Sequence, residues 1–255
     1  MKLTDKVALI TGSSQGIGAA IAQRFAAEGA RVVINYNSNL DKAKEVLANI
    51  EAKGGTGFIV GANLGVVADV QRLISDSIAH FGRLDILVNN AGIEIHAPFW
   101  EATEADYDKV LAVNAKGVFF ATQEMAKHLM ATKRPGKIIN VSSVHEDLPF
   151  PNFTAYCMSK GALKMMARNL SIELAPFGIT INNIAPGAIQ TPINTALLND
   201  PVKLTALLGQ IPLKRLGTTD DVANLAVFLA SADSDYVTGS TYLVDGGLTW
   251  NYQEQ

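Results

Sequence analysis

The sequence contains a tyrosine and a lysine at a spacing that suits proton transfer. Tyr156 and Lys160 are four residues apart at the start of a segment with helical periodicity, so both project from one face of the expected helix. A tyrosine hydroxyl titrates at about pH 10, and a neighbouring ammonium together with the positive nicotinamide of an oxidised cofactor favours its phenolate form. Such a group exchanges a proton with an alcohol or a carbonyl while hydride moves to or from a nicotinamide. Ser143, thirteen positions before Tyr156, is placed to hydrogen-bond the reacting oxygen.

A glycine-rich turn near the N-terminus predicts a dinucleotide site. The segment Thr11–Gly18 follows a short apolar run and precedes apolar residues at helical spacing. Glycine allows a tight turn and close approach of a phosphate, and the N–H groups that open the next helix attract a pyrophosphate. The spacing is G-x3-G-x-G and not the common G-x-G-x-x-G. A purely structural turn is the alternative, but the position between a strand and a helix favours the cofactor.

The end of the second expected strand bears on the choice of cofactor. Residues 34–38 read Ile-Asn-Tyr-Asn-Ser. A carboxylate here would bind the ribose hydroxyls of NAD and repel the 2′-phosphate of NADP, and neither a carboxylate nor an arginine or lysine is present. We expect NADP as the preferred cofactor, with NAD also usable.

These residues need a scaffold, and the hydrophobic pattern predicts one. Short, continuous apolar runs alternate with segments of 3.6-residue periodicity, which is typical of parallel strands covered on both faces by helices. We therefore expect an α/β fold with a doubly wound, seven-stranded parallel sheet in one domain over residues 1–255. The expected strands are Val7–Ile10, Arg31–Ile34, Gly57–Val60, Ile86–Val88, Lys137–Val141, Thr180–Ile184 and Thr241–Val244. The irregular region 187–212 is a candidate substrate lid.

Composition excludes several other classes of protein. Of 255 residues, 48% are hydrophobic and 18% are charged, which excludes a disordered chain. The net charge of −3, with no run of basic residues, gives no reason to expect nucleic acid or a membrane as a partner. The single cysteine, Cys157, excludes an internal disulfide, and the four histidines show no metal-ligand spacing. Without a signal peptide or a membrane span in the pattern, we expect a cytoplasmic protein that has no metal site.

Together these features resemble one family, the short-chain dehydrogenases/reductases, along the whole chain. The resemblance is carried by Thr11–Gly18, the Asn89-Asn90-Ala91-Gly92 segment, Asn114, Ser143, Tyr156, Lys160 and Pro186-Gly187. It implies a seven-stranded parallel sheet, NAD(P) in an extended pose and a homotetramer. It also implies that Lys160 holds the nicotinamide ribose, and that Asn114 anchors a water molecule in a proton relay.

The resemblance extends to the residues that would bind the cofactor. Asn90 would border the adenosine-side ribose, and Ile189 and Thr191 would face the nicotinamide carboxamide. The full expected set is Gly12, Ser14, Gln15, Gly16, Ile17, Gly18, Tyr36, Asn37, Ser38, Asn63, Leu64, Asn90, Ala91, Gly92, Tyr156, Lys160, Pro186, Gly187, Ile189 and Thr191.

Within the family, the chain is most similar to the glucose 1-dehydrogenases of the bacillus type. This similarity implies that Glu94, His145 and Asn194 bind a sugar, together with Ser143 and Tyr156, since carboxylate, imidazole and amide groups supply directional hydrogen bonds. A solvated loop charge, a packed strand-end residue and a polar lid residue are the respective alternatives. The residue after Tyr36 is often arginine in that group and is asparagine here, which leaves the preference for NADP open.

The expected reaction is oxidation of β-D-glucose to D-glucono-1,5-lactone by hydride transfer to NAD(P), with Tyr156 as general base. An NADPH-dependent carbonyl or 3-oxoacyl-(acyl carrier protein) reductase shares every catalytic residue and stays open. A carrier protein would need a basic patch near the mouth of the site, for which Lys203, Lys214 and Arg215 are available. A nucleotide-binding protein without turnover is a third interpretation, which the presence of both Tyr156 and Lys160 disfavours.

Overall fold

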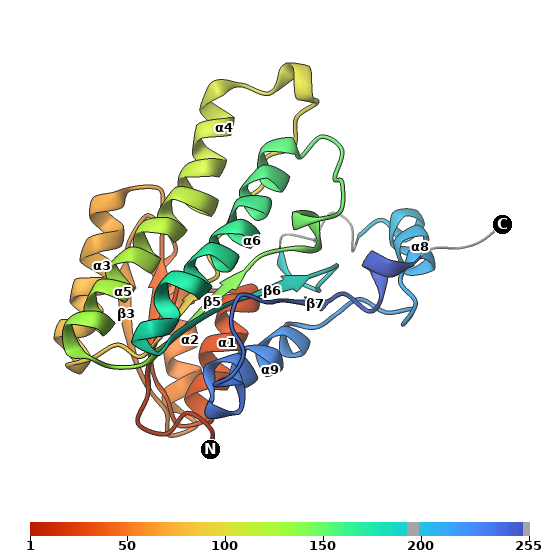
Figure 1. Cartoon of the computed structure of the whole chain (residues 1–255). Coiled ribbons are helices and arrows are strands. Elements are labelled where there is room, and N and C mark those ends of the chain that lie inside the picture. The colour runs from red at the N-terminus through yellow and green to blue at the C-terminus, as the bar shows by residue number, and fades with distance from the viewer. Residues whose placement is uncertain (193–198, 252–255) are drawn as a thin grey trace.

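Seven strands form one sheet in the part of the chain that the structure describes (Figure 1). The structure is a computed structural model and describes residues 1–192 and 199–251. The strand order is β3-β2-β1-β4-β5-β6-β7, and every neighbouring pair is parallel. The strands are β1 (Val7–Ile10), β2 (Arg31–Tyr36), β3 (Thr56–Gly61), β4 (Ile86–Asn89), β5 (Gly136–Val141), β6 (Ile179–Pro186) and β7 (Thr241–Val244).

Helices cover both faces of this sheet. The helices are α1 (Gly16–Ala27), α2 (Leu40–Glu51), α3 (Val67–Phe81), α4 (Glu104–Leu111), α5 (Val118–Thr132), α6 (Thr154–Leu174), α8 (Pro201–Gln210) and α9 (Thr219–Ala230). Short helical turns are η1 (Phe99–Glu101), η2 (Ala112–Gly117), η3 (Val144–Glu146), η4 (Ala175–Phe177), η6 (Ala232–Ser234) and η7 (Leu248–Trp250). Apolar residues of α1, α2 and α9 form the core on one face, and those of α3, α5 and α6 form the core on the other (Figure 1).

The predicted doubly wound sheet is confirmed. Strands β1 and β7 have the predicted bounds, whereas β2 continues to Tyr36 and β6 to Pro186 because their neighbours pair with them that far. The strand order reverses between β1 and β4. In open α/β sheets a ligand binds at such a reversal, beyond the carboxyl ends of the strands. The predicted functional residues lie in the segments after β1, β4, β5 and β6, so the fold brings them to one edge of the sheet.

A row of buried asparagines sets the level of these strand ends. The Asn89 side-chain nitrogen donates to the Asn140 side-chain oxygen at 2.9 Å, and Asn140 donates likewise to Asn183 at 2.9 Å. The three residues are in register on β4, β5 and β6 and are at most 2% exposed. Because a buried amide without partners is costly, a shift of one strand would break the row. The row therefore holds the segments after β4 and β5 at fixed heights.

The described part of the candidate lid, residues 187–192 and 199–212, contains a helix that the sequence pattern does not predict. This helix is α8, whereas the sequence pattern suggested an irregular segment. Asp200 caps this helix by accepting a hydrogen bond from the Lys203 backbone at 3.1 Å, and Pro201 occupies the first helical position. Both are standard helix-start signals. None of the helices within the described ranges is long and apolar enough to cross a membrane.

Candidate active site

The turn after β1 has the backbone of an anion-binding loop. Gly12 and Gly16 have φ values of +61° and +58°, a backbone conformation that residues with a side chain rarely adopt. Helix α1 starts at Gly16, its N-cap residue Gln15 makes no side-chain capping bond, and its first turn carries no acidic residue. The N–H groups at this helix start are thus left for an anion such as a pyrophosphate. The turn fits the predicted dinucleotide.

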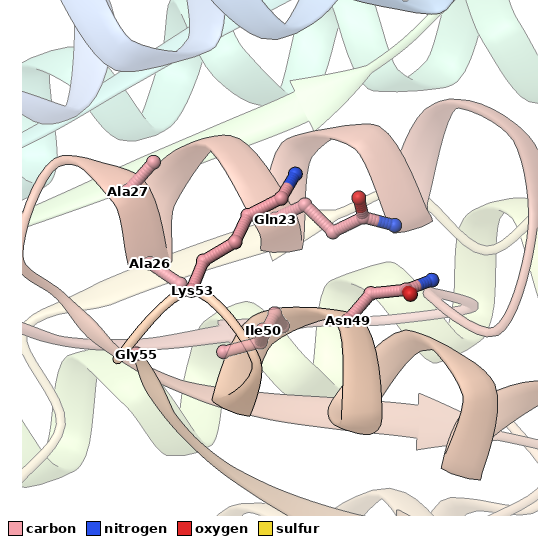
Figure 2. Close-up of a pocket in the computed structure, with 7 residues that line it drawn as sticks. All are labelled: Gln23, Ala26, Ala27, Asn49, Ile50, Lys53 and Gly55. Atoms are coloured by element: carbon pink, nitrogen blue, oxygen red, sulfur yellow. The ribbon is translucent and has the colours of Figure 1, made fainter.

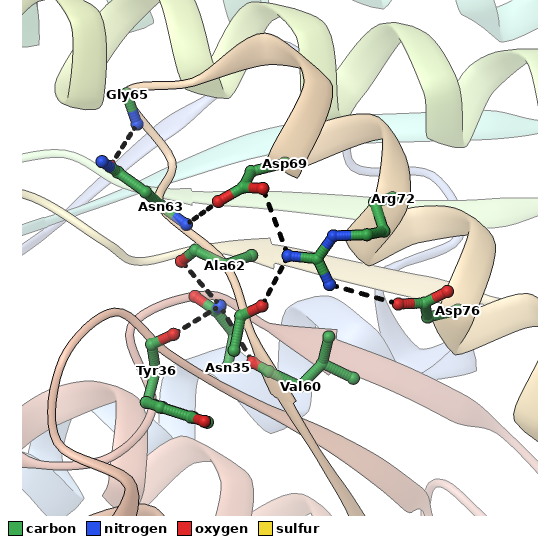
Figure 3. A network of polar contacts seen from close by, with 10 residues as sticks. Asn35, Tyr36, Val60, Ala62, Asn63, Gly65, Asp69, Arg72 and Asp76 are labelled. Atoms are coloured by element: carbon green, nitrogen blue, oxygen red, sulfur yellow. Dashed lines mark hydrogen bonds and ion pairs between the residues drawn. The ribbon is translucent and has the colours of Figure 1, made fainter.

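Asn35 anchors this turn to the sheet, a role that the sequence did not reveal. Its buried side-chain oxygen accepts a hydrogen bond from the Gly12 backbone at 2.9 Å. Its side-chain nitrogen donates to the backbone oxygens of Tyr36, Val60 and Ala62 (Figure 3). One amide therefore connects the glycine turn with the ends of β2 and β3. A polar residue inside an otherwise apolar strand was the available signal.

The segment after β3 is held by a second polar network. Arg72 of α3 donates to the Gly61 backbone oxygen at 2.8 Å and pairs with Asp69 and Asp76 (Figure 3). Asp69 accepts from the Asn63 backbone at 2.8 Å, so the exposed Asn63 is fixed near the ends of β2 and β3. Leu64 is only 7% exposed and packs in the core, so its side chain does not face this edge.

The loops after β1 and β4 are in direct contact. The Asn90 side-chain nitrogen donates to the backbone oxygens of Thr11 and Gly12, at 2.8 and 3.1 Å. A Cβ atom on Gly12 would lie 2.9 Å from the Ala91 Cα, and one on Gly18 would lie 2.4 Å from the Asn90 nitrogen. Asn90 was predicted to border a ribose, but its side-chain nitrogen holds the glycine turn. These loops therefore form one packed unit.

The residues after β6 lie across from the glycine turn. Thr191 side-chain atoms would be 3.9 Å from a Cβ atom on Gly16. Ile189 is buried and forms an isolated parallel bridge with Gly217, while Gly187 lies close to Asp245. The segment thus forms the opposite wall of the predicted cofactor site. Asn194 lies outside the described residues.

The exposed residues after β2 gain a cation from α2. Tyr36 is half-buried, and Asn37 and Ser38 are exposed. Lys42 reaches back from the first turn of α2, and its Nζ lies 2.7 Å from the Gln15 Oε1 in the glycine turn. The end of β2 carries no basic residue, but the fold supplies one between that strand end and the turn.

Ser143, Tyr156 and Lys160 meet where β5 faces the start of α6. The Ser143 hydroxyl accepts a hydrogen bond from the His145 backbone at 3.1 Å and also hydrogen-bonds with Tyr156. Lys160 is 4% exposed, and its Nζ donates to the Val141 backbone oxygen at 2.9 Å. The same Nζ lies 5.5 Å from the centre of the Tyr156 ring. The structure therefore brings the three predicted residues together.

Without cofactor, the environment of Tyr156 favours the protonated phenol. Burial raises the pKa of Tyr156 to about 12; the Ser143 hydrogen bond opposes this shift and the Glu94 charge adds to it. Burial likewise lowers the pKa of Lys160 to about 8, against the favourable charges of Glu146 and Glu94. Desolvation is the largest effect on both groups, so Tyr156 is protonated at neutral pH. The positive charge of an oxidised nicotinamide would favour the phenolate when that cofactor binds.

Asn114 lies in a π-helical turn, η2, and its side chain makes three hydrogen bonds. Its side-chain nitrogen donates to the Ile93 backbone oxygen at 2.8 Å and to the Ser159 hydroxyl at 3.1 Å. Its side-chain oxygen accepts from the Ile93 backbone at 2.9 Å. A Cβ atom on Gly92 would lie 3.5 Å from that oxygen and 3.7 Å from the Lys160 Nζ. Asn114 thus fixes the loop after β4 beside Lys160.

Two of the predicted sugar contacts lie beside Tyr156. The Glu94 carboxyl has a raised pKa because it is partly removed from water, an effect that Lys160 opposes. The His145 ring stacks on Phe150 with centres 4.2 Å apart and stands edge-on to Tyr156 at 6.4 Å. Its Nδ1 lies 3.2 Å from the Leu148 backbone oxygen, and burial lowers its pKa. Because a carbonyl only accepts, Nδ1 carries the proton and Nε2 of the neutral ring is an acceptor.

The cavities differ in what they can hold. One of about 20 Å³ lies between α1 and α2, lined by residues that include Gln23, Asn49 and Lys53, and has room for about one water molecule (Figure 2). A cleft of about 510 Å³ is lined by Leu148, Gln210, Leu248 and Asn251. It adjoins the Tyr156 side of the site, because Leu148 contacts His145. The cleft has the size of a small-molecule site.

Known proteins match this chain along nearly its whole length. The family described as enoyl-(acyl carrier protein) reductase matches residues 12–249. The chain is 43% identical over 247 residues to 3beta-hydroxysteroid dehydrogenase 1 of Eggerthella lenta, covering 97% of this chain and 95% of that protein. It is 40% identical over 248 residues to glucose 1-dehydrogenase 2 of Bacillus subtilis, covering 97% and 96% respectively.

A solved structure adds the cofactor. A gluconate 5-dehydrogenase from Burkholderia cenocepacia, in complex with NADP and tartrate, superposes with a TM-score of 0.92 at 38% identity, covering 97% of this chain and 96% of that one. The predicted family and cofactor class are thereby confirmed. The protein belongs to the short-chain dehydrogenases/reductases and is an NAD(P)-dependent oxidoreductase.

Proposed function

We propose that the protein oxidises a sugar at a ring hydroxyl, with β-D-glucose as substrate and D-glucono-1,5-lactone as product. The substrate C–H bond breaks with hydride transfer to the nicotinamide, and the hydroxyl proton passes to Tyr156. Ser143 hydrogen-bonds the reacting oxygen, Lys160 holds the nicotinamide ribose and Asn114 anchors a water molecule. Residues 187–212 act as a lid over the substrate.

The pair of acceptors beside Tyr156 is the observation that carries this proposal. Glu94 and the Nε2 atom of His145 both accept hydrogen bonds, and a sugar offers several hydroxyl donors. The Bacillus subtilis relative, named glucose 1-dehydrogenase 2, supports the same substrate.

The basic residues proposed for a carrier protein are already engaged. Arg215 makes two hydrogen bonds with Asp221, Lys203 pairs with Asp200 at 3.2 Å, and the Lys214 Nζ donates to the Gly209 backbone oxygen. The carboxylates of Asp200 and Asp221 offset the charges of Lys203 and Arg215, which disfavours the 3-oxoacyl reductase alternative, whereas the backbone partner of Lys214 leaves its charge in place.

A substrate panel run with both cofactors tests the function. We expect the wild-type protein to form reduced nicotinamide from β-D-glucose and NADP⁺ or NAD⁺, and the Tyr156→Phe variant not to form it. The absorbance of the reduced nicotinamide measures the reaction. The panel includes a 3β-hydroxysteroid, an aryl ketone and a 3-oxoacyl thioester. No turnover of glucose together with fast NADPH-dependent reduction of either carbonyl compound would overturn the sugar proposal.

We also propose NADP as the preferred cofactor, with Lys42 binding its 2′-phosphate. Lys42 lies between the end of β2 and the glycine turn, which is where the adenosine ribose of a dinucleotide binds in such sheets. Within the described residues the side-chain partner of Lys42 is the neutral Gln15, so the charge of Lys42 is available to an anion. The glucose 1-dehydrogenases of the bacillus type often have an arginine after the position of Tyr36. In this protein the cation would come from α2 instead.

Replacing Lys42 with alanine is expected to raise the Kd for NADP⁺ about tenfold, equivalent to about 1.4 kcal/mol, because a charge-assisted contact is lost. The Kd for NAD⁺ should change little, since NAD lacks the phosphate. Quenching of tryptophan fluorescence or calorimetry measures both constants without turnover. Lys44→Ala is the control, because Lys44 lies in the same helix but pairs with Asp41. An equal loss for both cofactors would contradict the assignment.

The proposed assembly is a homotetramer in the cytoplasm. Met158, Met165 and Ile172 are spaced by seven residues on α6 and are 50%, 62% and 77% exposed. Apolar residues at this spacing form one stripe of a helix, which supports packing of α6 against a second subunit across a two-fold axis. A monomer in light scattering would contradict this assembly.

A further inference from the structure

A buried carboxylate, Glu146, lies near the start of α6, the helix that carries the proposed catalytic Lys160. Glu146 ends the turn η3, and its side chain has no exposure to solvent. Its Oε2 accepts a hydrogen bond from the Ser142 hydroxyl at 2.6 Å. Its Oε1 is buried without a hydrogen-bond partner among the described residues. Burying a carboxylate in this way is costly unless a cation compensates its charge.

Two lysines of α6 can provide that compensation, and one of them is already paired. The Lys164 Nζ lies 3.8 Å from the Glu146 Oε1, but it also contacts both carboxylate oxygens of Asp147. Lys160, one helical turn earlier, is 4% exposed and has no carboxylate at ion-pair distance within the described residues, and the charges of Glu146 and Glu94 act on it from further away. Its Nζ binds the Val141 backbone oxygen, and Val141 directly precedes Ser142, which binds Glu146. Both charges are therefore anchored on adjacent residues at the end of β5.

We propose that Glu146 is a positioning residue that keeps Lys160 in its ammonium form and holds it under Tyr156. It also ties η3, which follows Ser143, to α6. The inference rests on the proposed role of Lys160 and is independent of the substrate that the enzyme oxidises.

The electrostatic environment of Lys160 supports this assignment. Burial lowers its pKa to about 8, and Glu146 opposes that shift more strongly than Glu94 does. Glu94, from the loop after β4, also raises the pKa of Tyr156, whereas Glu146 has no recorded effect on the tyrosine. Of the two carboxylates that favour the Lys160 ammonium, Glu146 is therefore the one that does not also act on Tyr156.

Two substitutions should shift the titration of Lys160 in opposite directions. Glu146→Gln retains an acceptor for Ser142 but removes the negative charge, so the pKa of Lys160 should fall by about one pH unit. Lys164→Gln removes a positive charge near the same site, so that pKa should rise. Asp147→Asn, a half-exposed neighbour of Glu146, is the matched control and should have little effect because solvent screens its charge.

The experiment titrates full-length protein without cofactor by ¹³C NMR of labelled lysine Cε atoms, with the Lys160 signal assigned from Lys160→Met. Carbonyl reduction needs protonated Tyr156 and the Lys160 ammonium, so the alkaline loss of kcat should move with the NMR midpoint in each variant. An unchanged Lys160 midpoint in Glu146→Gln would overturn the proposal. If Glu146→Gln does not fold, the Lys164→Gln variant provides the test. A Lys160 titration midpoint in Lys164→Gln that stays the same or falls would also overturn the proposal. Because the NMR readout needs no substrate, failure of the glucose proposal leaves this test intact.

Discussion

Replacing Tyr156 with phenylalanine is expected to lower kcat by about 10²- to 10⁴-fold, the usual contribution of a general acid–base group. The phenol is the group placed to exchange the substrate proton, since it hydrogen-bonds Ser143 and lies beside the Lys160 ammonium. Removing one oxygen atom leaves the ring and its edge-on contact with His145 in place. Steady-state kinetics with whichever substrate the panel identifies measures the loss.

Two further measurements separate a catalytic loss from a structural one. The Kd for NADP⁺ and the unfolding midpoint of Tyr156→Phe should stay close to those of the wild type. The control is Tyr236→Phe, which removes the same oxygen atom from a fully exposed tyrosine in a different part of the chain. A Tyr156→Phe enzyme with unchanged kcat would show that the proton passes through another group.

Replacing Gly18 with alanine is expected to raise the Kd for the cofactor about 100-fold, the loss of roughly two charge-assisted hydrogen bonds. The added methyl group would lie 2.4 Å from the Asn90 side-chain nitrogen and 2.6 Å from the Gly12 backbone oxygen. Because the second of these is backbone, the glycine turn itself must move. Overpacking of this kind also costs about 1–3 kcal/mol of stability, which urea unfolding measures.

Gly82→Ala is the control for this substitution. Gly82 has a φ of +75° at the end of α3 and open space around its Cα atom. The variant should lose about 1–2 kcal/mol from backbone strain alone and bind the cofactor normally. If Gly18→Ala binds NADP⁺ as tightly as Gly82→Ala does, the turn after β1 does not bind the pyrophosphate.

Local patterns in the sequence were sufficient for the strands and for most of the site. Each strand of the sheet was placed within two residues at either end, because a parallel strand buried on both faces is a continuous apolar run. The helix α8 was not predicted, although Asp200 and Pro201 are standard signals for a helix start. These two residues alone do not predict the helix, because no clear apolar periodicity follows them.

The roles of single polar residues were harder to predict. Asn35 and Asn90 both lie in predicted segments, yet their bonds to the glycine turn join residues more than twenty positions apart. Glu146 stands beside His145 in the sequence and had no predicted role. Its importance depends on complete burial next to two lysines of α6. Contacts of this kind depend on packing, which spacing along the chain does not encode.

The sequence by itself determined the parallel sheet, the glycine turn between a strand and a helix, and the face shared by Tyr156 and Lys160. Each follows from a repeat or spacing of a few residues. Only the tertiary structure decided the charges. Burial makes Tyr156 a proton donor without cofactor, because desolvation disfavours the charged phenolate. Folding also brings Lys42 to Gln15, since distance in space and access to water set the effect of a charge.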